Sequence, residues 1–279
     1  MDPTFFTDFL APRALGGLER ESIRYALGTL TTFFVIWVIL GRFIQSRRIR
    51  KAIPVAKQRR QIRMELRNSF FAMAMFVALD MLVFEAGNFG VFKKYDDISQ
   101  YGWLWFWVSM PLLIIFHDAY FYWTHRAMHH PKLYKLFHLT HHRSHSPTPF
   151  TAYNFHPFEA AVNYAFVPVA LMIIPIHGTA LYVVLTIMIF KNALGHCGYE
   201  VFPRHWARLP VLGWLTTVTH HDMHHERGSG NFALYFTWWD RAMGTEHTNY
   251  LDRLDEQEAR AQAAKDARRS NSDPLVPAE

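Results

Sequence analysis

The histidines of this 279-residue chain are not scattered. Of 17 in total, eight lie within residues 117–145 and six within 196–225. Three short elements repeat a spacing of three or four residues, which places side chains on one face of a helix. Each element can therefore direct two or three imidazoles toward a common point. The elements are HRAMH (His125 and His129), HLTHH (His138, His141 and His142) and HDMHH (His221, His224 and His225).

This much imidazole predicts metal binding. Imidazole is the commonest metal ligand in proteins and suits zinc, copper, iron and nickel. A catalytic zinc ion typically takes three protein ligands and a water molecule. Eight clustered histidines exceed the needs of one ion, so the pattern predicts two metals. The single cysteine, Cys197, excludes an internal disulfide and a thiolate-rich site. A nitrogen-rich site of this kind, next to lipid, favours redox metals over a hydrolytic one.

The elements that must position these histidines are apolar blocks of membrane-spanning length. A spanning helix needs about 20 apolar residues. Three blocks approach or exceed this length, and two shorter ones, separated by PIHG, predict a hairpin. The sequence therefore predicts an all-α integral membrane protein with about four to five transmembrane or membrane-embedded helices. The long blocks are residues 22–44, 69–92 and 101–123, and the hairpin arms are 158–176 and 179–195.

The third of these helices is expected to continue beyond the membrane. From Phe116 onward no helix breaker occurs before Pro131, so we predict that this helix continues to about residue 130. Its last turns would then carry His125 and His129 out of the bilayer. The first two histidines of the pattern are thus expected on a helix that begins in lipid and ends in water.

The distribution of positive charge predicts the orientation in the membrane. Residues 46–67 contain nine Lys and Arg and one Glu, and the net charge is +6. Cytoplasmic loops carry such an excess of positive charge. We therefore expect no nucleic-acid partner. With this loop in the cytoplasm, the helix count places both histidine-rich stretches on the cytoplasmic side, in a helical cap with one di-metal site. Bacterial inner membrane and endoplasmic reticulum both fit such a multi-pass protein.

The order of the motifs resembles that of a known family. HDAYFYWTHRAMH, HLTHH, TAYNFHPFE, GHCGYE, HHDMHH and WDRAMGT follow one another between about residues 100 and 245. This set is similar to that of the fatty acid hydroxylase / sterol desaturase superfamily of membrane di-iron oxygenases. The resemblance implies two iron ions that use O2 and two electrons to hydroxylate or desaturate a C–H bond of a membrane lipid. The metal ligands that it implies are His125, His129, His138, His141, His142, His221, His224 and His225, with His196 of GHCGYE as a further ligand.

Two residues near the motifs are expected to support the ligands. Asp118 lies within about 20° of His125 around the third helix, so we predict that it orients a ligand histidine. His156, in FHPFE with Glu159, is predicted to act in the same way from the start of the hairpin. The roles of His117 and His220 stay open.

An acidic residue at membrane depth suggests a contact between helices. Asp80 lies inside the second apolar block, where carboxylates are uncommon and usually functional. Counting from the helix ends places it near the level of Lys191. We therefore predict a buried ion pair between Asp80 and Lys191.

The chain lacks motifs for its own electron supply. It has no dinucleotide-binding fingerprint after a strand, no P-loop and no cysteine-rich iron–sulfur run. Electrons are thus expected from an external NAD(P)H-linked donor, through ferredoxin or a b-type cytochrome with its reductase. Three regions are predicted: residues 1–100 with two transmembrane helices and a basic loop, 101–248 with the oxygenase core, and 249–279 with a charged helix and a disordered tail.

Alternatives of other classes fit less well. A metal transporter would place histidines midway along spanning helices. A zinc-dependent hydrolase would need a general base such as the glutamate of HExxH, which does not occur. Within the oxygenase hypothesis, hydroxylation is preferred. Desaturation stays open as the alternative, because both reactions begin with the same hydrogen abstraction.

Overall fold

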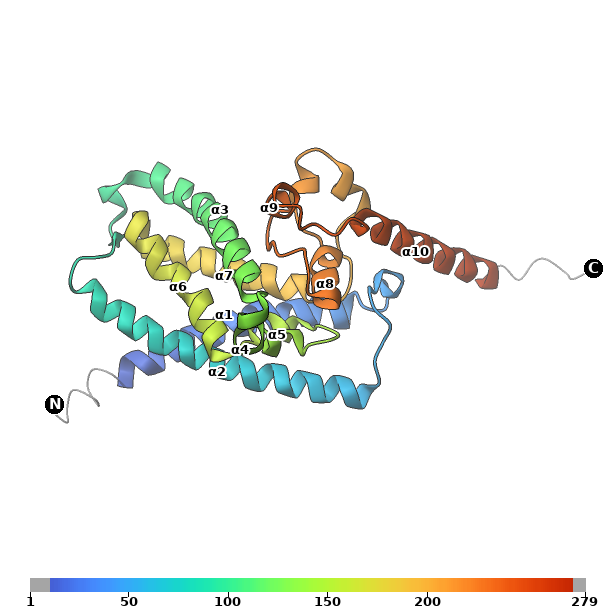
Figure 1. Cartoon of the computed structure of the whole chain (residues 1–279), viewed down its shortest axis with the longest axis horizontal. Coiled ribbons are helices and arrows are strands. Elements are labelled where there is room, and N and C mark those ends of the chain that lie inside the picture. Colours follow the sequence, from blue (N-terminus) through green and yellow to red (C-terminus); the bar gives the residue numbers. More distant parts are fainter. Residues whose placement is uncertain (1–10, 273–279) are drawn as a thin grey trace, which may run out of the picture.

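The computed structural model describes residues 11–272, and helices dominate this part of the chain (Figure 1). The longer helices are α1 (Ala11–Thr32, continued by a π-helix at Phe33–Ile39), α2 (Val55–Gly87), α3 (Gly102–Met128), α6 (Pro157–Ile173), α7 (Gly178–Gly195) and α10 (Tyr250–Ser272). Short helices α4 (Pro131–Phe137), α5 (Leu139–His142), α8 (Val218–Arg227) and α9 (Trp238–Ala242) lie between them. Single 3-10 turns occur at Gln45–Arg47, Ile98–Gln100, Pro149–Tyr153, Arg204–Arg208 and Leu212–Trp214.

Four of the helices are long and apolar enough to cross a membrane, and α6 is a shorter apolar helix. The four segments are Ala11–Ile39, Val55–Gly87, Gly102–Met128 and Gly178–Gly195. Large apolar side chains on them face outward, as Leu104 does with 80% of its surface exposed. Such exposure suits lipid rather than water. The predicted all-α membrane fold is confirmed, including the long third helix and the hairpin of α6 and α7.

The predicted starts of the first two helices were wrong. α1 begins at Ala11 rather than residue 22, and α2 begins at Val55 rather than residue 69. Much of the basic segment 46–67 is therefore helix and not loop. After Pro54 the segment is rich in Ala, Lys, Arg, Gln and Glu, which favour helix. Charge marks where a helix meets the membrane boundary, but it does not end the helix.

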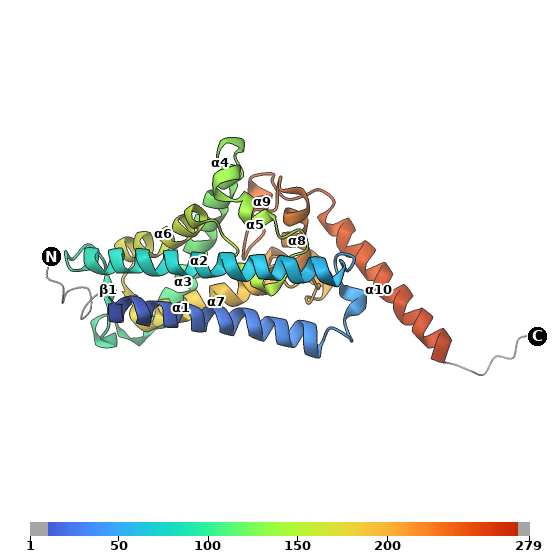
Figure 2. The same ribbon diagram turned by 90° about the horizontal axis from the view of Figure 1, so that it is seen from below.

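The long helices form a bundle along which α1 and α2 run side by side (Figure 2). α1 also packs against α7, and α2 packs against α6. Gly28 permits the close approach of α1 to α7, since a Cβ there would lie 2.9 Å from Ile189 Cγ1. At one end of the bundle, strands β1 (Lys94–Tyr95) and β2 (Ile176–His177) pair in parallel. This pair ties the segment after α2 to the turn of the hairpin.

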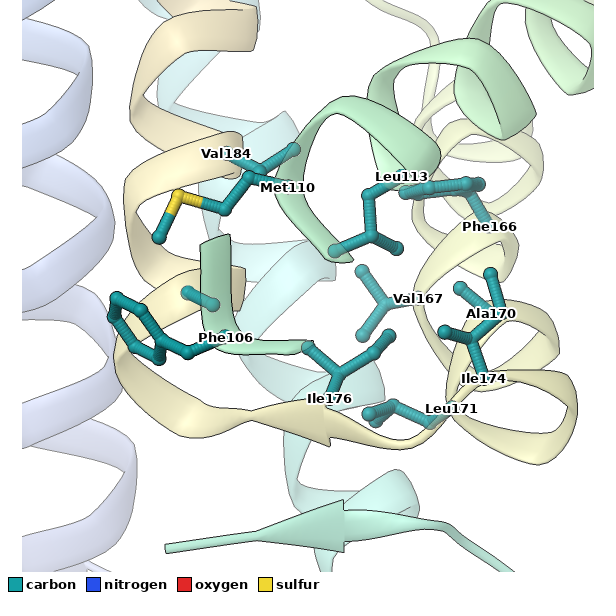
Figure 3. Packing of buried hydrophobic residues seen from close by; sticks show 11 residues of the cluster. Phe106, Met110, Leu113, Phe166, Val167, Ala170, Leu171, Ile174, Ile176 and Val184 are labelled. Carbon is teal, nitrogen blue, oxygen red and sulfur yellow. The ribbon is translucent and has the colours of Figure 1, made fainter. Parts of the chain in front are cut away.

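A hydrophobic cluster fixes α3 against the hairpin (Figure 3). Leu113 of α3, Phe166 of α6 and Val184 of α7 are completely buried in it. Complete burial of a large apolar side chain contributes about 1.5–3 kcal/mol. The first half of α3 is thus held rigidly against the hairpin. The C-terminal end of the helix, its inner end, therefore projects in a defined direction.

The inner end of α3 meets the histidine-bearing cap, which consists of α4, α5, α8 and α9 (Figure 1). Thr217 caps the start of α8, where its hydroxyl accepts a hydrogen bond from the His220 amide, and Gly228, with φ of 65°, caps its end. α10 extends away from the cap (Figures 1 and 2). The predicted C-terminal helix is present, and the predicted disordered tail lies largely outside the described residues.

The predicted ion pair between Asp80 and Lys191 was wrong. Asp80 lies 3.6 Å from Arg20 and accepts a hydrogen bond from the Tyr164 hydroxyl at 3.0 Å. Lys191 donates instead to the carbonyl and hydroxyl oxygens of Thr216. Counting residues from helix ends gives the depth of a side chain but not the direction in which its helix face points.

Candidate metal centre

Nine histidines converge in two adjoining groups inside the cap. Within each group the candidate ligand atoms all lie within 4.8 Å of one another. Every member is buried except the half-buried His129. All nine histidines expected as ligands are therefore brought together, and no other described histidine joins either group. The five-histidine group contains His125, His129, His138, His142 and His224, and the four-histidine group contains His141, His196, His221 and His225.

Two of the sequence elements divide their histidines between the groups. On α5 and the turn before it, His138 and His142 join one group while His141 joins the other. Positions i and i+4 differ by only about 40° around a helix, whereas i+3 lies on the other side of i. The histidines of α8 divide in the same way. The expectation that each element serves one common point was therefore wrong, and the two groups share their supporting helices.

The hydrogen bonds of four rings fix which nitrogen carries the proton. In each ring Nδ1 lies 2.6–2.7 Å from an oxygen that accepts, either a backbone carbonyl or a carboxylate. Nδ1 must then donate, and Nε2 of the neutral ring keeps a free lone pair. The four bonds are His125 to the Phe232 carbonyl, His224 to the Gly230 carbonyl, His196 to the Asn192 carbonyl and His138 to the Glu159 carboxylate.

The free Nε2 atoms point at one another in the five-histidine group. His125 Nε2 lies 2.9 Å from His138 Nε2, and both rings carry their proton on Nδ1. Two lone pairs at this distance repel each other. A cation that both nitrogens coordinate removes the repulsion, because it accepts both lone pairs. His224 Nε2 adds to the convergence, at 3.0 Å from His142 Nε2 and 3.2 Å from His129 Nε2.

The four-histidine group has the same property around His196. Its Nε2 lies 3.0 Å from the Nε2 atoms of His221 and His225 and 3.2 Å from that of His141. One nitrogen cannot satisfy three others by hydrogen bonding. The buried Nδ1 atoms of His141, His221 and His225 have no hydrogen-bond partner in the described structure. The donor set therefore fits a second metal ion.

The electrostatics of the centre keep the rings neutral. Burial, with a smaller contribution from the neighbouring imidazoles, lowers the pKa of His142 to about 3. Burial likewise lowers the pKa of His196 to about 4. The same cause lowers the pKa of His221, His224 and His225. Neutral imidazole is the form that binds a metal, so the rings need not lose a proton at pH 7.

Glu159, rather than His156, supports a histidine of the centre. Glu159 is buried on α6, and its carboxylate accepts from His138 Nδ1 at 2.6 Å. His156 instead caps α6 by accepting a hydrogen bond from the Phe158 amide. The expectation for His156 was therefore wrong, although the FHPFE motif does supply a supporting group three residues later.

The expectation that Asp118 orients a ligand histidine was also wrong. Its carboxylate accepts from the amides of Tyr235 and Phe236 at 3.0 and 3.2 Å, and from Trp238 Nε1 at 2.7 Å. Asp118 faces nearly the same direction as His125, but seven residues of helix separate them by about 10 Å. Asp118 therefore holds the loop that follows Phe232.

Two further carboxylates hold the centre, and the sequence analysis missed both. Asp240 accepts from the amides of Phe232 and Ala233 at 2.9 Å, next to the carbonyl that binds His125. Asp222 accepts from Arg50 Nε at 2.8 Å, which fastens α8 to the segment after α1. The sequence signal that could have identified them is their position inside the motifs, Asp240 in WDRAMGT and Asp222 in HDMHH.

The two histidines with open roles lie outside both groups. His117 is buried on α3, with its ring 4.6 Å from that of Phe166. His220 is buried on α8, where its ring meets the edge of Tyr250 and its Nε2 lies 3.7 Å from Asp240. Neither is placed to share a metal with the nine.

A cavity of about 960 Å³ adjoins the centre. Walls from α1, α2, α3, α6 and α7 enclose it, and Phe121, Phe155 and Asn192 line its inner end. The Phe121 ring lies 4.9 Å from that of His125, and the Phe155 ring lies 5.5 Å from that of His141. A side chain that lines the cavity therefore contacts one histidine of each group.

These features define a class: a helical membrane protein with two adjoining histidine groups suited to a di-metal site and with a large cavity between its membrane helices. Residues 110–245 match the family model described as fatty acid hydroxylase, and the chain belongs to this family. The resemblance seen in the ordered motifs is thereby confirmed.

Curated relatives agree with this membership. The chain is 33% identical to a Delta(7)-sterol 5(6)-desaturase of Gibberella zeae over 196 residues, which cover 70% of this chain and 58% of that protein. It is 31% identical to methylsterol monooxygenase 1 of Rattus norvegicus, over 47% of this chain and 44% of that protein. It is also 31% identical to lathosterol oxidase of Mus musculus, over 56% and 51%.

The chain thus spans about three fifths or less of the length of these relatives. No solved structure matches it significantly.

Proposed function

We propose that this protein is a membrane oxidoreductase that uses O2 to oxidise a C–H bond of a sterol-like lipid at a two-iron centre. Hydroxylation is the preferred assignment and desaturation the alternative. The observation that carries the proposal is the pairing of unprotonated Nε2 atoms, such as those of His125 and His138 at 2.9 Å, beside a cavity of lipid-compatible size. The names of the relatives include both a sterol desaturase and a methylsterol monooxygenase, which supports a sterol-like substrate.

The nine histidines would hold the metals, one ion in each group. Iron bound there would supply the reductive activation of O2 that an unactivated C–H bond requires. Hydroxylation then converts R–H, O2, two electrons and two protons into R–OH and water. Desaturation with the same reactants removes two hydrogens from adjacent carbons and forms two waters. In both cases two electrons must come from outside the chain.

The supporting residues hold the ligands in place. Glu159 accepts a hydrogen bond from His138 Nδ1 and so keeps Nε2 of that ring free to coordinate. Asp240 fixes the backbone at Phe232, whose carbonyl does the same for His125. A ligand held by such a partner keeps its orientation when substrate arrives.

The aromatic end of the cavity would control what reaches the centre. Phe121 and Phe155 line the cavity, and their rings contact His125 and His141 of the two histidine groups. Their rings exclude water from the reacting carbon and leave room for a hydrocarbon. A lipid that enters between the membrane helices would meet the metals only at this end.

The placement of the histidines supports an enzyme over a transporter. His129 follows the end of α3, and His196 follows the end of α7. A transport site is expected near the midpoint of spanning helices instead. We further propose that the cap faces the cytoplasm, as the basic segment 46–67 indicates, and that a ferredoxin or b-type cytochrome linked to NAD(P)H delivers electrons there.

The test is metal content combined with turnover. Protein purified anaerobically in mild detergent should contain about two irons per chain by plasma mass spectrometry. His138→Ala and His224→Ala should lose iron, whereas His205→Ala, which changes an exposed histidine outside both groups, should keep it. With a reductase system and sterols, O2 uptake should accompany an oxidised product. A single zinc ion, or iron that persists in both variants, would contradict the proposal.

A further inference from the structure

The cavity extends far from the histidines, and its distant part is polar. Tyr182 and Asn192 both line it and both belong to α7. Tyr182 precedes His196 by 14 residues, which is about 21 Å of helix. At the level of Tyr182, α1 contributes Glu21 and Arg24 to the cavity wall. The cavity therefore has an inner end beside the metal centre and a polar region about 20 Å away.

Arg24 and Glu21 form an ion pair that is unusual in its burial. Their side chains are only 9% and 14% exposed. The Arg24 guanidinium lies 5.7 Å from the centre of the Tyr182 ring, which further fixes its position. Arg24 Nε and Glu21 Oε2 are both buried and have no hydrogen-bond partner among residues 11–272. A buried charged group with an unused donor or acceptor is costly, so a partner is expected in a functional complex.

The other ion pairs of the cavity do not share these properties. Arg20 and Asp80 are 58% and 53% exposed and lie 3.6 Å apart. Lys94 and Asp96, at the outer end, are also largely exposed and pair with each other. Only the pair of Arg24 and Glu21, among these three, combines burial with one unused donor and one unused acceptor.

One unused donor and one unused acceptor in the same ion pair complement a hydroxyl group. A hydroxyl oxygen accepts from Arg24 Nε, and its hydrogen is donated to Glu21 Oε2. The pair carries no net charge, so an anionic or cationic headgroup would leave one of its members repelled. The cavity wall also includes Phe76, Val77 and Phe84, which suit a hydrocarbon body.

We infer that Arg24 and Glu21 bind the hydroxyl of the lipid substrate, and that the carbon to be oxidised lies remote from that hydroxyl, about 20 Å along the cavity. This inference rests on the proposed function. A sterol anchored here by its ring hydroxyl presents its side-chain end to the histidines, not the ring that bears the hydroxyl. A long-chain alcohol presents the end of its chain. Position along the cavity, and not the metal centre, then decides which carbon reacts.

Equilibrium binding tests the hydroxyl site without turnover. The full-length protein, kept anaerobic and without an electron donor, is incubated with tritiated cholesterol in mild detergent. Unlabelled cholesterol, its methyl ether, 1-octadecanol and octadecane serve as competitors. The wild-type protein should prefer cholesterol over its ether by about 10-fold, because the ether leaves Glu21 without a donor. A matching preference for octadecanol over octadecane would show that any extended alcohol satisfies the site.

Variants assign the preference to the pair. Arg24→Leu and Glu21→Met should reduce the preference to about 2-fold or less, a change of the size expected for one lost buried hydrogen bond. Glu19→Met is the matched control, since Glu19 is exposed on the same helix outside the cavity wall and should keep the full preference. Thermal unfolding of each variant identifies any that fail to fold. Glu21→Met changes the side-chain volume little, removes the accepting oxygens, and tests the inference even if Arg24→Leu is unstable.

The results that overturn the inference are distinct from those that overturn the proposed function. Equal competition by cholesterol and its ether, or an unchanged preference in Glu21→Met, would remove the hydroxyl site while leaving iron content and O2 uptake unaffected. Absence of iron would remove the proposed function whatever the binding shows. Where turnover occurs, mass spectrometry of the product should locate the oxidation away from the hydroxyl-bearing ring. Oxidation next to the hydroxyl would overturn the inferred orientation.

Discussion

His125 Nε2 lies 2.9 Å from His138 Nε2, and both rings donate their Nδ1 proton to an oxygen of the protein. The contact between the two Nε2 atoms is not a hydrogen bond, because neither Nε2 carries a hydrogen to donate. The fold therefore holds two lone pairs against each other at the end of α3. Packing elsewhere in the fold, as around Leu113, stabilises this arrangement. A bound cation would be coordinated by both nitrogens and so remove the repulsion between their lone pairs.

Metal removal should destabilise the cap. A chelator that extracts both ions would leave the converging Nε2 atoms without a cation, so the free energy of unfolding should fall by several kcal/mol, since metal bound only by the folded state stabilises it by mass action. Thermal unfolding monitored by circular dichroism measures the change. Readdition of ferrous iron should restore the original midpoint. An identical midpoint with and without chelator would argue against a bound metal.

Loss of the Glu159 carboxylate should weaken metal binding. Glu159→Ala removes the acceptor of His138 Nδ1, and such partners typically contribute 10–100-fold in metal affinity. Competition with a chelator of known affinity gives the change. Glu159→Gln retains an accepting oxygen and should lose less. Glu258→Ala changes an exposed glutamate of α10 and is the control. Equal metal affinity of the Ala variant and the wild type would show that Glu159 is not a support.

The fastening of α8 by Arg50 should contribute to stability. Arg50→Ala leaves Asp222 buried without its cation, because Arg50 Nε donates to the carboxylate and its terminal nitrogen donates to the Asp222 carbonyl. Arg50 is itself 25% exposed, so we expect a loss of about 1–3 kcal/mol. Chemical unfolding gives the value. Lys51→Ala alters the neighbouring exposed charge and should change stability by less than about 0.5 kcal/mol.

The metal-free protein should lose stability in mild acid. Burial lowers the pKa of His142 to about 3 and that of His196 to about 4, whereas an unfolded histidine titrates near 6.5. Below pH 6.5 the unfolded chain therefore binds protons that the folded chain does not bind. The free energy of unfolding falls with pH until the pKa values of these histidines in the folded chain are reached. Above pH 7 these rings cause no pH dependence. Unfolding midpoints between pH 7.5 and 4.5 measure the slope.

A single substitution checks the origin of that slope. His142→Gln removes one ring that titrates only on unfolding, so its stability should fall less steeply with acid than that of the wild type. A slope that is unchanged in His142→Gln would assign the acid sensitivity to groups outside the metal centre.

Opening the aromatic end of the cavity should uncouple O2 use from lipid oxidation. Phe121→Ala removes the ring that lines the cavity and contacts His125, and it admits water to the centre. Product formed per O2 consumed should fall severalfold, while iron content stays close to that of the wild type. Leu82→Ala, which shortens an exposed side chain outside the cavity wall, is the control. Unchanged coupling in Phe121→Ala would indicate that the ring does not guard the centre.

The periodicity of the sequence determined the helices and the identity of the clustered histidines. Apolar blocks of spanning length and the i, i+3, i+4 spacing are local properties, so HRAMH, HLTHH and HDMHH could be recognised without any coordinates. The extension of the third helix beyond the membrane followed from the absence of a breaker between Phe116 and Pro131. Local patterns were weakest at helix ends, where the charged residues after Pro54 continue the helix of the apolar block.

Only the tertiary structure decided how the histidines divide and which acids support them. His141 and His142 are neighbours in the chain, yet they serve different groups because their side chains leave α5 about 100° apart. Asp118 lies at nearly the same angle around α3 as His125, but its carboxylate accepts hydrogen bonds from the segment 232–238 instead. Glu159 reaches His138 because the hairpin folds back against α4. Such contacts join residues far apart in sequence, and no spacing along one helix encodes the distance between two.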